Sequence, residues 1–184
     1  MVGVKPSGPT PATIAILGEA PGEDEAAFGT PFVGASGQEL TRMLTEAGLR
    51  RSEIFLTNVF DERPPNNDLK AWAVPKAQAG GGPWPSIAQG KYLPHDLWSA
   101  ATERVRSELA PVMPNLLICL GNTASILALH QGSISKTRGA VAHSSVFGVK
   151  TLPTYHPAAV LRAWDLRPTV ILDFIKARAE AESP

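Results

Sequence analysis

The chain has 184 residues, of which 43% are hydrophobic and 18% are charged, and its 17 basic and 17 acidic side chains give a formal net charge of zero. This length and composition fit one globular domain with a sizeable core. The balance of charge excludes a domain that is basic throughout, although it does not exclude a local basic face that would contact nucleic acid.

The cysteine content and the hydropathy pattern exclude further classes. Cys119 is the single cysteine, so the chain can form neither an internal disulfide nor a metal site built from several cysteines. It lies in the apolar run of residues 116–120, which predicts a small buried side chain in a strand. No apolar run approaches the ~20 residues that span a membrane, and the first residues hold no apolar signal core. We therefore expect a cytoplasmic protein with no membrane partner and no metal.

The first predicted unit is a strand, a long loop and a helix. Residues 1–11 are rich in proline and glycine and predict a loose lead-in. The apolar run of residues 13–17 stops at Gly18, which predicts a buried strand. A glycine-marked loop follows as far as Gly37, and loops of this kind commonly hold sites. Apolar residues then recur at helical spacing, which predicts a helix over residues 37–47.

The second predicted unit contains a strand and an unusually long irregular segment. Residues 54–59 predict a second buried strand. Residues 61–94 then hold much of the proline and glycine, and a loop of this length in a compact domain is usually functional or disordered. Trp72, Trp84 and Tyr92 indicate that parts of this insertion loop pack against the domain.

The remaining sequence returns to alternating strands and helices. The patterns predict a helix, a strand, a helix, a small hairpin, a strand and a final helix over residues 95–109, 115–120, 123–130, 141–147, 150–153 and 168–180. Strands that alternate with helices predict an α/β fold, here a three-layer α/β/α sandwich with a central four-stranded, mainly parallel sheet. We expect a single domain over residues 1–184, and a monomer.

Polar side chains follow three of the predicted strands. Glu19 follows the first strand, Asn58 ends the second, and His156 follows the last. Ligands of such sheets bind outside the carboxyl ends of the strands, so these three side chains are expected to converge at one edge. An amide can read a flat heterocycle, an imidazole can donate to an oxygen that gains negative charge, and Glu19 or Glu23 can orient or deprotonate water.

Two other features of the first loop fit a nucleotide. Phe32 could stack on a planar ring. Gly34, Gly37 and Arg42 could meet a phosphate near the start of a helix. Each residue also has a purely structural interpretation: an asparagine that caps a turn, a histidine that only holds structure, a phenylalanine in the core, and an acidic run, residues 23–25, on a solvated loop.

Longer motifs carry a family resemblance. They are GEAPG, GTPFVGASG, TNVFDERPPNN, LG and YHPAAVLR, at residues 18–22, 29–37, 57–67, 120–121 and 155–162. In this order they resemble the uracil-DNA glycosylase superfamily, and most closely its family 4. The resemblance covers about residues 13–180.

The resemblance implies a role for each matching residue. Phe32 would stack on a flipped uracil, Asn58 would bind its pairing edge and reject cytosine, and His156 would stabilise the anionic oxygen of the departing base. Glu19 would support the water or the loop. Val160, Leu161 and Arg162, which follow the histidine in the same motif, would press into the duplex where the base leaves. Ala20 would lie beside the base, where family 1 enzymes have an aspartate that activates water and family 4 has alanine.

The activity implied is that of a monofunctional glycosylase. It would act on uracil-containing DNA, single- or double-stranded, and leave an abasic site in base excision repair without a metal or organic cofactor. Backbone amides of the glycine loops and scattered cations would hold phosphates, namely Arg42, Lys136, Arg138, Arg162 and Arg167. Because the net charge is zero, we expect this binding to be lost at moderate salt.

The chain departs from family 4 in one respect, and two other functions stay open. Family 4 carries an iron–sulfur cluster on four cysteines, whereas this chain has Glu62 at one of those positions and lacks the N-terminal pair. Residues 68–94 could replace the structural role of the cluster. A protein that binds uracil or abasic sites without turnover, or covalently through a histidine, is the main alternative, with candidates His95, His130 and His143. A nucleotide-binding domain is disfavoured, because the loop is not GxGxxG and no GK[ST] is present.

Overall fold

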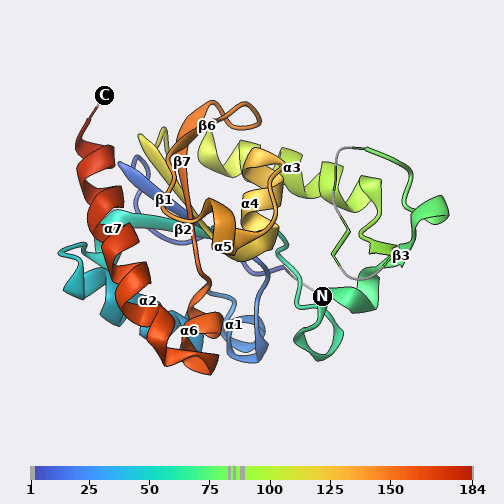
Figure 1. Cartoon of the computed structure of the whole chain (residues 1–184), viewed down its shortest axis with the longest axis horizontal. Helices are drawn as coiled ribbons and strands as arrows, with labels where there is room; N and C mark the ends of the chain where they lie inside the picture. Colours follow the sequence, from blue (N-terminus) through green and yellow to red (C-terminus); the bar gives the residue numbers. More distant parts are fainter. Residues whose placement is uncertain (1–2, 83, 85, 88–89, 184) are drawn as a thin grey trace.

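The central sheet has five strands, one more than predicted. The computed structural model describes residues 3–82, 84, 86–87 and 90–183. The strand order is β2-β1-β5-β7-β6, with bounds Ile54–Asn58, Ile14–Gly18, Leu116–Leu120, Val149–Thr154 and Ala142–Ser144 (Figure 1). The first four strands run parallel, which confirms the expected α/β class with its mainly parallel sheet. The extra strand, β6, pairs antiparallel with β7, so the hairpin predicted around residues 141–147 is formed by β6 and β7 together.

The parallel strands are buried on both faces, as their unbroken apolar sequences predict. Ala15 and Leu17 of β1 pack into one hydrophobic cluster, whereas Ile14 and Ile16 pack into a second cluster on the other face. Successive strand residues point to opposite faces, so this alternation places a separate core on each side of the sheet. Cys119 of β5 has no exposed surface, which confirms the prediction of a small side chain inside a strand.

Helices cover both faces and complete three layers. The helices are α1, α2, α3, α4, α5, α6 and α7, at Glu23–Phe28, Ala35–Glu46, His95–Leu109, Gly121–Leu129, Ile134–Thr137, Pro157–Arg162 and Arg167–Glu182. Helices α3 and α4 pack in the cluster that holds Ala15, and α2, α6 and α7 pack in the cluster that holds Ile14 (Figure 1). Short 3-10 helices lie at Arg51–Glu53, Pro65–Asn67, Leu69–Trp72, Lys76–Gln78 and Trp164–Leu166.

Two local predictions differ from the structure. The acidic run, residues 23–25, was read as a solvated loop but forms the first turn of α1, and Glu25 is buried. Residues 3–11, expected as a loose lead-in, lie along the outer edge of β2, where Ser7 and Leu56 exchange two backbone hydrogen bonds of 2.9 and 2.7 Å. This pairing covers the edge of the sheet, which would otherwise expose unpaired backbone groups.

The insertion after β2 is held mainly by aromatic rings. It contains a two-stranded antiparallel ribbon, β3 (Val74–Pro75) and β4 (Lys91–Tyr92), which projects from the body of the domain beyond α3 (Figure 1). The Trp84 ring stacks on the Trp98 ring of α3 at a centroid distance of 5.0 Å, and Phe60 contacts Trp72 at 5.5 Å. Among the described residues, no helix is long and apolar enough to cross a membrane.

Candidate active site

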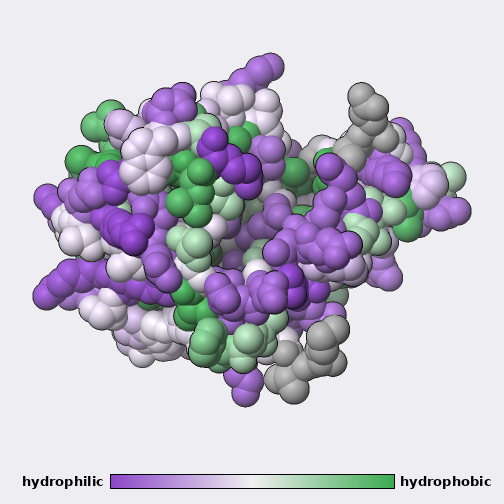
Figure 2. Space-filling view, turned by 90° about the horizontal axis from the view of Figure 1, so that it is seen from below, coloured by the Kyte–Doolittle hydropathy of each residue, from purple (hydrophilic) through white to green (hydrophobic). Residues whose placement is uncertain are grey.

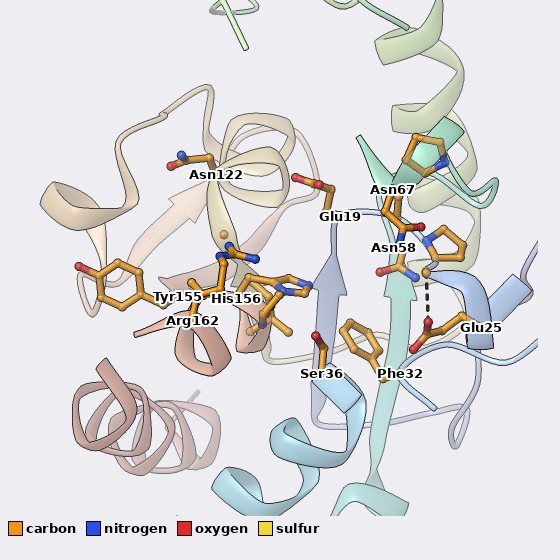
Figure 3. A pocket seen from close by; sticks show the side chains of 18 of the residues that line it. Glu19, Glu25, Phe32, Ser36, Asn58, Asn67, Asn122, Tyr155, His156 and Arg162 are labelled. Atoms are coloured by element: carbon orange, nitrogen blue, oxygen red, sulfur yellow. Dashed lines mark hydrogen bonds between the residues drawn. The ribbon is translucent and has the colours of Figure 1, made fainter. Parts of the chain in front are cut away.

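A cavity of about 480 Å³ opens at the carboxyl edge of the sheet. It is lined by residues from the loops after β1, β2, β5 and β7, including Glu19, Ala20, Phe32, Asn58, His156 and Arg162. Figure 3 shows Phe32, Asn58 and Glu25 on one side of the cavity, Asn122 and Tyr155 on the other, and Glu19 and His156 between them. The convergence inferred from the strand ends is therefore present in the structure.

One side of the cavity forms a slot between an aromatic ring and an amide. Gly18 pairs with Asn58 across β1 and β2, and a Cβ atom at Gly18 would lie 2.2 Å from Asn58 Oδ1 and 2.5 Å from Phe32 Cζ. Only glycine leaves room for both side chains to approach β1. Phe32 and Asn58 are each 6% exposed, so the slot is largely shielded from water.

The loop that carries Phe32 is tied together by one buried carboxylate. Glu25 accepts hydrogen bonds from the backbone N–H groups of Gly22, Val33 and Gly34, at 3.1, 3.0 and 2.9 Å. Phe32 has a left-handed backbone, with φ at 57°, a conformation that costs free energy for a residue with a side chain. The Glu25 hydrogen bonds hold the residues just after Phe32, so they stabilise this conformation.

The backbone at Asn58 is also held by a half-buried network. The Arg104 guanidinium of α3 donates to the carbonyl oxygens of Asn58 and Val59, at 2.6 and 2.8 Å. Arg104 in turn pairs with Glu108, which accepts the Thr57 hydroxyl at 2.6 Å. These contacts engage only the backbone of Asn58, so they leave its side chain free to meet a ligand.

His156 is held as a neutral donor. The Ala158 N–H donates to His156 Nδ1 at 3.1 Å, as at the first turn of a capped helix. Burial lowers the pKa of His156 to about 4, with the nearby Arg162 adding to the effect and Glu25 opposing it. Because Nδ1 accepts a hydrogen bond, the neutral ring carries its proton on Nε2. The His156 ring lies 6.4 Å from the Phe32 ring, measured between centroids.

Among the cavity residues, Glu19 is a carboxylate whose pKa is shifted. Burial raises its pKa, and the charge of Asp68 acts in the same direction, whereas a hydrogen bond from Thr123 and the charge of Arg162 oppose the rise. The Thr123 hydroxyl donates to Glu19 Oε2 and fixes the carboxylate at the start of α4. A carboxylate with a raised pKa is a better proton acceptor than an ordinary one.

The residues expected to contact DNA are dispersed. Arg162 lines the cavity, and Leu161 is 45% exposed beside it, but Val160 has no exposed surface and packs in the core. The Gly34 N–H is already bound by Glu25, and a Cβ atom at Gly37 would lie 1.9 Å from the Phe32 carbonyl oxygen. Local structure therefore explains why positions 34 and 37 are glycine, and neither residue lines the cavity.

Three of the four expected cations away from the cavity, Arg42, Arg138 and Arg167, form ion pairs, whereas Lys136 forms none among the described residues. Arg42 is exposed and pairs with Glu39 at 3.1 Å. Arg138 forms a two-point pair with the buried Asp173, which also accepts the Thr154 hydroxyl at 2.6 Å. Arg42 and Arg138 therefore have structural partners within the chain.

An iron–sulfur cluster does not fit the residues present. Cys119 is sealed inside β5, where burial raises the pKa of its thiol, and Glu62 is exposed. Within the described part of the chain, no group of three or more histidine, cysteine, aspartate or glutamate side chains is arranged to hold a metal ion. Near Glu62, Phe60 packs instead against the aromatic rings of Trp72 and Trp98.

The sequence analysis did not identify several residues that shape the cavity. Thr123 and Arg104 act through partners that are far away in the sequence, whereas Glu25 binds backbone N–H groups three, eight and nine residues away, and no local pattern marks any of the three. Asn67 and Tyr155 line the cavity from within motifs that were recognised. For Asn67 and Tyr155, membership of a motif was the sequence signal that could have placed them in the cavity.

A shielded slot with an aromatic ring, an amide and a neutral imidazole, at the carboxyl edge of a parallel sheet, defines an α/β protein that binds a planar heterocycle. Residues 6–178 match the Uracil DNA glycosylase superfamily, and the chain belongs to this superfamily. The resemblance inferred from the motifs is thereby confirmed.

Relatives support the same assignment over most of the chain. The type-4 uracil-DNA glycosylase of Archaeoglobus fulgidus is 39% identical over 173 residues, which cover 90% of this chain and 75% of the relative. The type-4 uracil-DNA glycosylase of Saccharolobus solfataricus is 34% identical over 185 residues, covering 96% and 74%. That of Thermotoga maritima is 34% identical over 170 residues, covering 90% and 76%.

Proposed function

We propose that this chain is a monofunctional uracil-DNA glycosylase, which hydrolyses the bond between uracil and deoxyribose and leaves an abasic site in DNA. The observation that carries the proposal is the meeting of Phe32, Asn58 and His156 in one shielded cavity. Membership of the superfamily and the names of the relatives point to the same activity. A base inside a duplex cannot reach such a cavity, so the enzyme would bind deoxyuridine flipped out of the stack.

Recognition of the base would depend on Asn58. Its amide offers one donor edge and one acceptor edge, which can match the N3–H and O4 groups of uracil. Cytosine presents an amino group where uracil has O4, so the same orientation of the amide would face two donors toward each other. A buried polar group left unpaired costs about 1–3 kcal/mol, which is enough to discriminate between the two bases.

Departure of the base would depend on His156. When the glycosidic bond breaks, the electron pair goes to uracil, which leaves as an anion with charge on its oxygens. The neutral His156 ring, with its proton on Nε2, would donate a hydrogen bond to one of these uracil oxygens. Burial of the imidazole keeps it neutral and strengthens this hydrogen bond, because water does not compete for it.

Water attack would depend on Glu19. The water adds its oxygen to the sugar carbon and loses its proton, which Glu19 can accept because its pKa is raised. The Thr123 hydroxyl would keep the carboxylate in place during the reaction. The ionised carboxylate would also stabilise the positive charge on the sugar as the bond breaks.

The DNA around the flipped nucleotide would meet the rim of the cavity. Arg162 lies in the cavity wall, and Leu161 is exposed next to it, so the pair can contact a phosphate and the gap in the stack. We propose no such contact for Val160, because it is buried. The protein would work as a monomer in the cytoplasm.

The test is release of uracil from an end-labelled oligonucleotide with a single deoxyuridine, single-stranded or opposite G or A. We expect strand cleavage only after alkali, and its loss in Asn58→Ala. Asn58→Asp should lower uracil release and admit cytosine. His143→Ala, an exposed histidine away from the cavity, is the matched control. An SDS-stable complex without cleavage would favour a protein that captures the base or the abasic site, and wild-type rates in Asn58→Ala would remove Asn58 from the site.

A further inference from the structure

The insertion after β2 contains a long stretch whose charged side chains are all basic. Residues 69–94, here called the lysine arm, contain Lys70, Lys76 and Lys91 and no acidic residue. The arm therefore carries a charge of +3, and the rest of the chain, with 14 basic and 17 acidic side chains, carries −3. A net charge of zero for the whole chain conceals this asymmetry, and local excess of one sign is what attracts a charged partner.

The lysines of the arm are also more available than most arginines of the domain. Lys70, Lys76 and Lys91 are exposed, and no ion pair within the described residues involves them. By contrast, seven arginines each pair with a carboxylate of the described residues, namely Arg42, Arg50, Arg63, Arg104, Arg106, Arg138 and Arg167. Ion pairs among the described residues thus leave the positive charge of the arm unneutralised.

The arm begins at the rim of the cavity. Asn67 lines the cavity, and Lys70 follows three residues later, so their Cα atoms are separated by at most about 11 Å. The pairing of Pro75 with Lys91 places Lys91 next to Lys76. The arm then returns to the start of α3, where His95 N–H donates to the Ala79 carbonyl oxygen at 2.8 Å. Helix α3 runs toward the start of β5, so its own start lies at the cavity edge of the sheet.

The figures agree with this placement. In Figure 1 the part of the arm that contains β3 extends to one side of the domain, beyond α3. Figure 2, which views the molecule from below, shows a hollow in the middle of the face and hydrophilic side chains on the lobe to its right. The aromatic contacts of Trp72 and Trp84 with the body fix the arm beside this face, so its lysines need no large ordering to meet a ligand.

We propose that the lysine arm is a second DNA-contact surface, which binds backbone phosphates of DNA that flanks the flipped deoxyuridine. The proposal rests on the proposed function and adds to it a set of contacts outside the cavity. Exposed lysines on a two-stranded ribbon can neutralise phosphates without reading bases, so the arm would contribute affinity and salt dependence rather than sequence preference.

The test measures the salt dependence of DNA binding. Fluorescence anisotropy would follow the whole protein on a labelled duplex with one tetrahydrofuran abasic analogue, which the enzyme cannot cut, between 50 and 200 mM salt. In Lys76→Gln/Lys91→Gln, the slope of log affinity against log salt should be shallower by up to about 1.8, since each phosphate contact contributes about 0.9. Over this fourfold range of salt, the loss of affinity would then be about 12-fold smaller than in the wild type. Adding Lys70→Gln should flatten the slope further.

A matched control removes two positive charges at the opposite edge of the sheet. Arg50 precedes β2 and Arg106 lies near the end of α3, and their side chains are 77% and 46% exposed. Arg50→Gln/Arg106→Gln should keep the wild-type slope. Equal slopes in the two double variants, or a wild-type slope in Lys76→Gln/Lys91→Gln, would overturn the arm as a contact surface. Uracil release by the wild type is measured separately, so its absence would count against the proposed function, whereas release with unchanged slopes would count against the arm alone.

Discussion

The cavity and the lysine arm lie next to each other, but they are held in place by different interactions. The cavity residues are fixed by strand register and by hydrogen bonds to backbone groups, such as those of Glu25, Arg104 and Ala158. The arm is fixed by ring packing, with Trp84 on Trp98, and by a ribbon of two residues in each strand. Directional hydrogen bonds define positions narrowly, whereas packed rings on a short ribbon fix mainly where a segment lies.

This difference suits the two tasks. Discrimination between uracil and cytosine depends on single hydrogen bonds, whose strength falls steeply with distance and angle. Attraction of phosphates depends on charge, which acts over about 8 Å at physiological ionic strength. A loosely positioned lysine can serve the second task but not the first. Variants of the two regions should therefore fail in different ways.

The largest effect is expected from Trp98→Ala. Trp98 is fully buried and its ring lies 5.7 Å from Phe60 and 5.0 Å from Trp84, so the substitution leaves a cavity under the arm. The free energy of unfolding should fall by about 3–5 kcal/mol, as measured by urea denaturation. Phe28→Ala, at a side chain that is 74% exposed, should change it by less than about 0.5 kcal/mol. Similar losses in both variants would show that the aromatic contacts do not anchor the arm.

His156→Ala should instead affect chemistry. Loss of one preorganised donor to a developing anion costs about 2.7–4 kcal/mol of transition-state stabilisation, or roughly 10²–10³ in rate. Single-turnover release of uracil measures this directly, with urea denaturation to check that the fold persists. A reduction of less than tenfold would mean that His156 only caps α6.

Glu25→Gln probes the backbone hydrogen bonds of the cavity. Glutamine offers one acceptor oxygen in place of two and carries no charge, so the N–H groups of Gly22, Val33 and Gly34 cannot all be satisfied. We expect a loss of about 1–3 kcal/mol in the free energy of unfolding and weaker binding of uracil DNA. Asp24→Asn, at the neighbouring exposed carboxylate, is the control, and the same result in both variants would contradict the role of Glu25 in the loop.

Glu19→Gln should give the smallest change in stability, with a distinctive pH dependence. Because the folded protein raises the pKa of Glu19, the folded state opposes ionisation, and the charged carboxylate lowers stability above its ordinary pKa of 4.5. Glu19→Gln should therefore raise the melting temperature at pH 7, and the gain should disappear below that pKa, where the carboxyl group is protonated in both states.

The same variant should slow uracil release and remove the fall in rate on the acidic side. In the wild type, this fall should be centred above pH 4.5, since the pKa is raised. Glu23→Gln, whose side chain is 78% exposed, is the control and should keep the acidic limb. An acidic limb that persists in Glu19→Gln would assign the titration to another group.

The sequence predicted much of the fold and the centre of the cavity, because both follow from local patterns. Buried parallel strands are continuous apolar runs, and the residues that end them must meet at one edge, which located Glu19, Asn58 and His156. Four of the long helices were predicted within two residues at each end. The fifth strand was missed because β6 has three residues and is defined by its pairing with β7 rather than by its own sequence.

Supporting residues could not be predicted in this way. Glu25 looks like part of a solvated acidic run, and only the folded loop shows that its oxygens face three backbone N–H groups. Val160 sits in the same motif as Leu161, yet one side chain is in the core and the other at the surface, because α6 packs one face against α2. Such distinctions depend on tertiary contacts that leave no trace in a short window of sequence.

The position of β1 in the sheet affects when the protein first becomes active during its synthesis. Strand β1 is made first but lies between β2 and β5, and Leu17 pairs with Cys119, about a hundred residues later in the chain. His156 leaves the ribosome later still. A nascent chain thus holds Phe32 and Asn58, the proposed base-binding residues, for some time without the complete sheet that aligns them or the imidazole of His156. In the proposed reaction, the enzyme would therefore be unable to cleave the sugar–base bond until His156 has been translated and the sheet has formed.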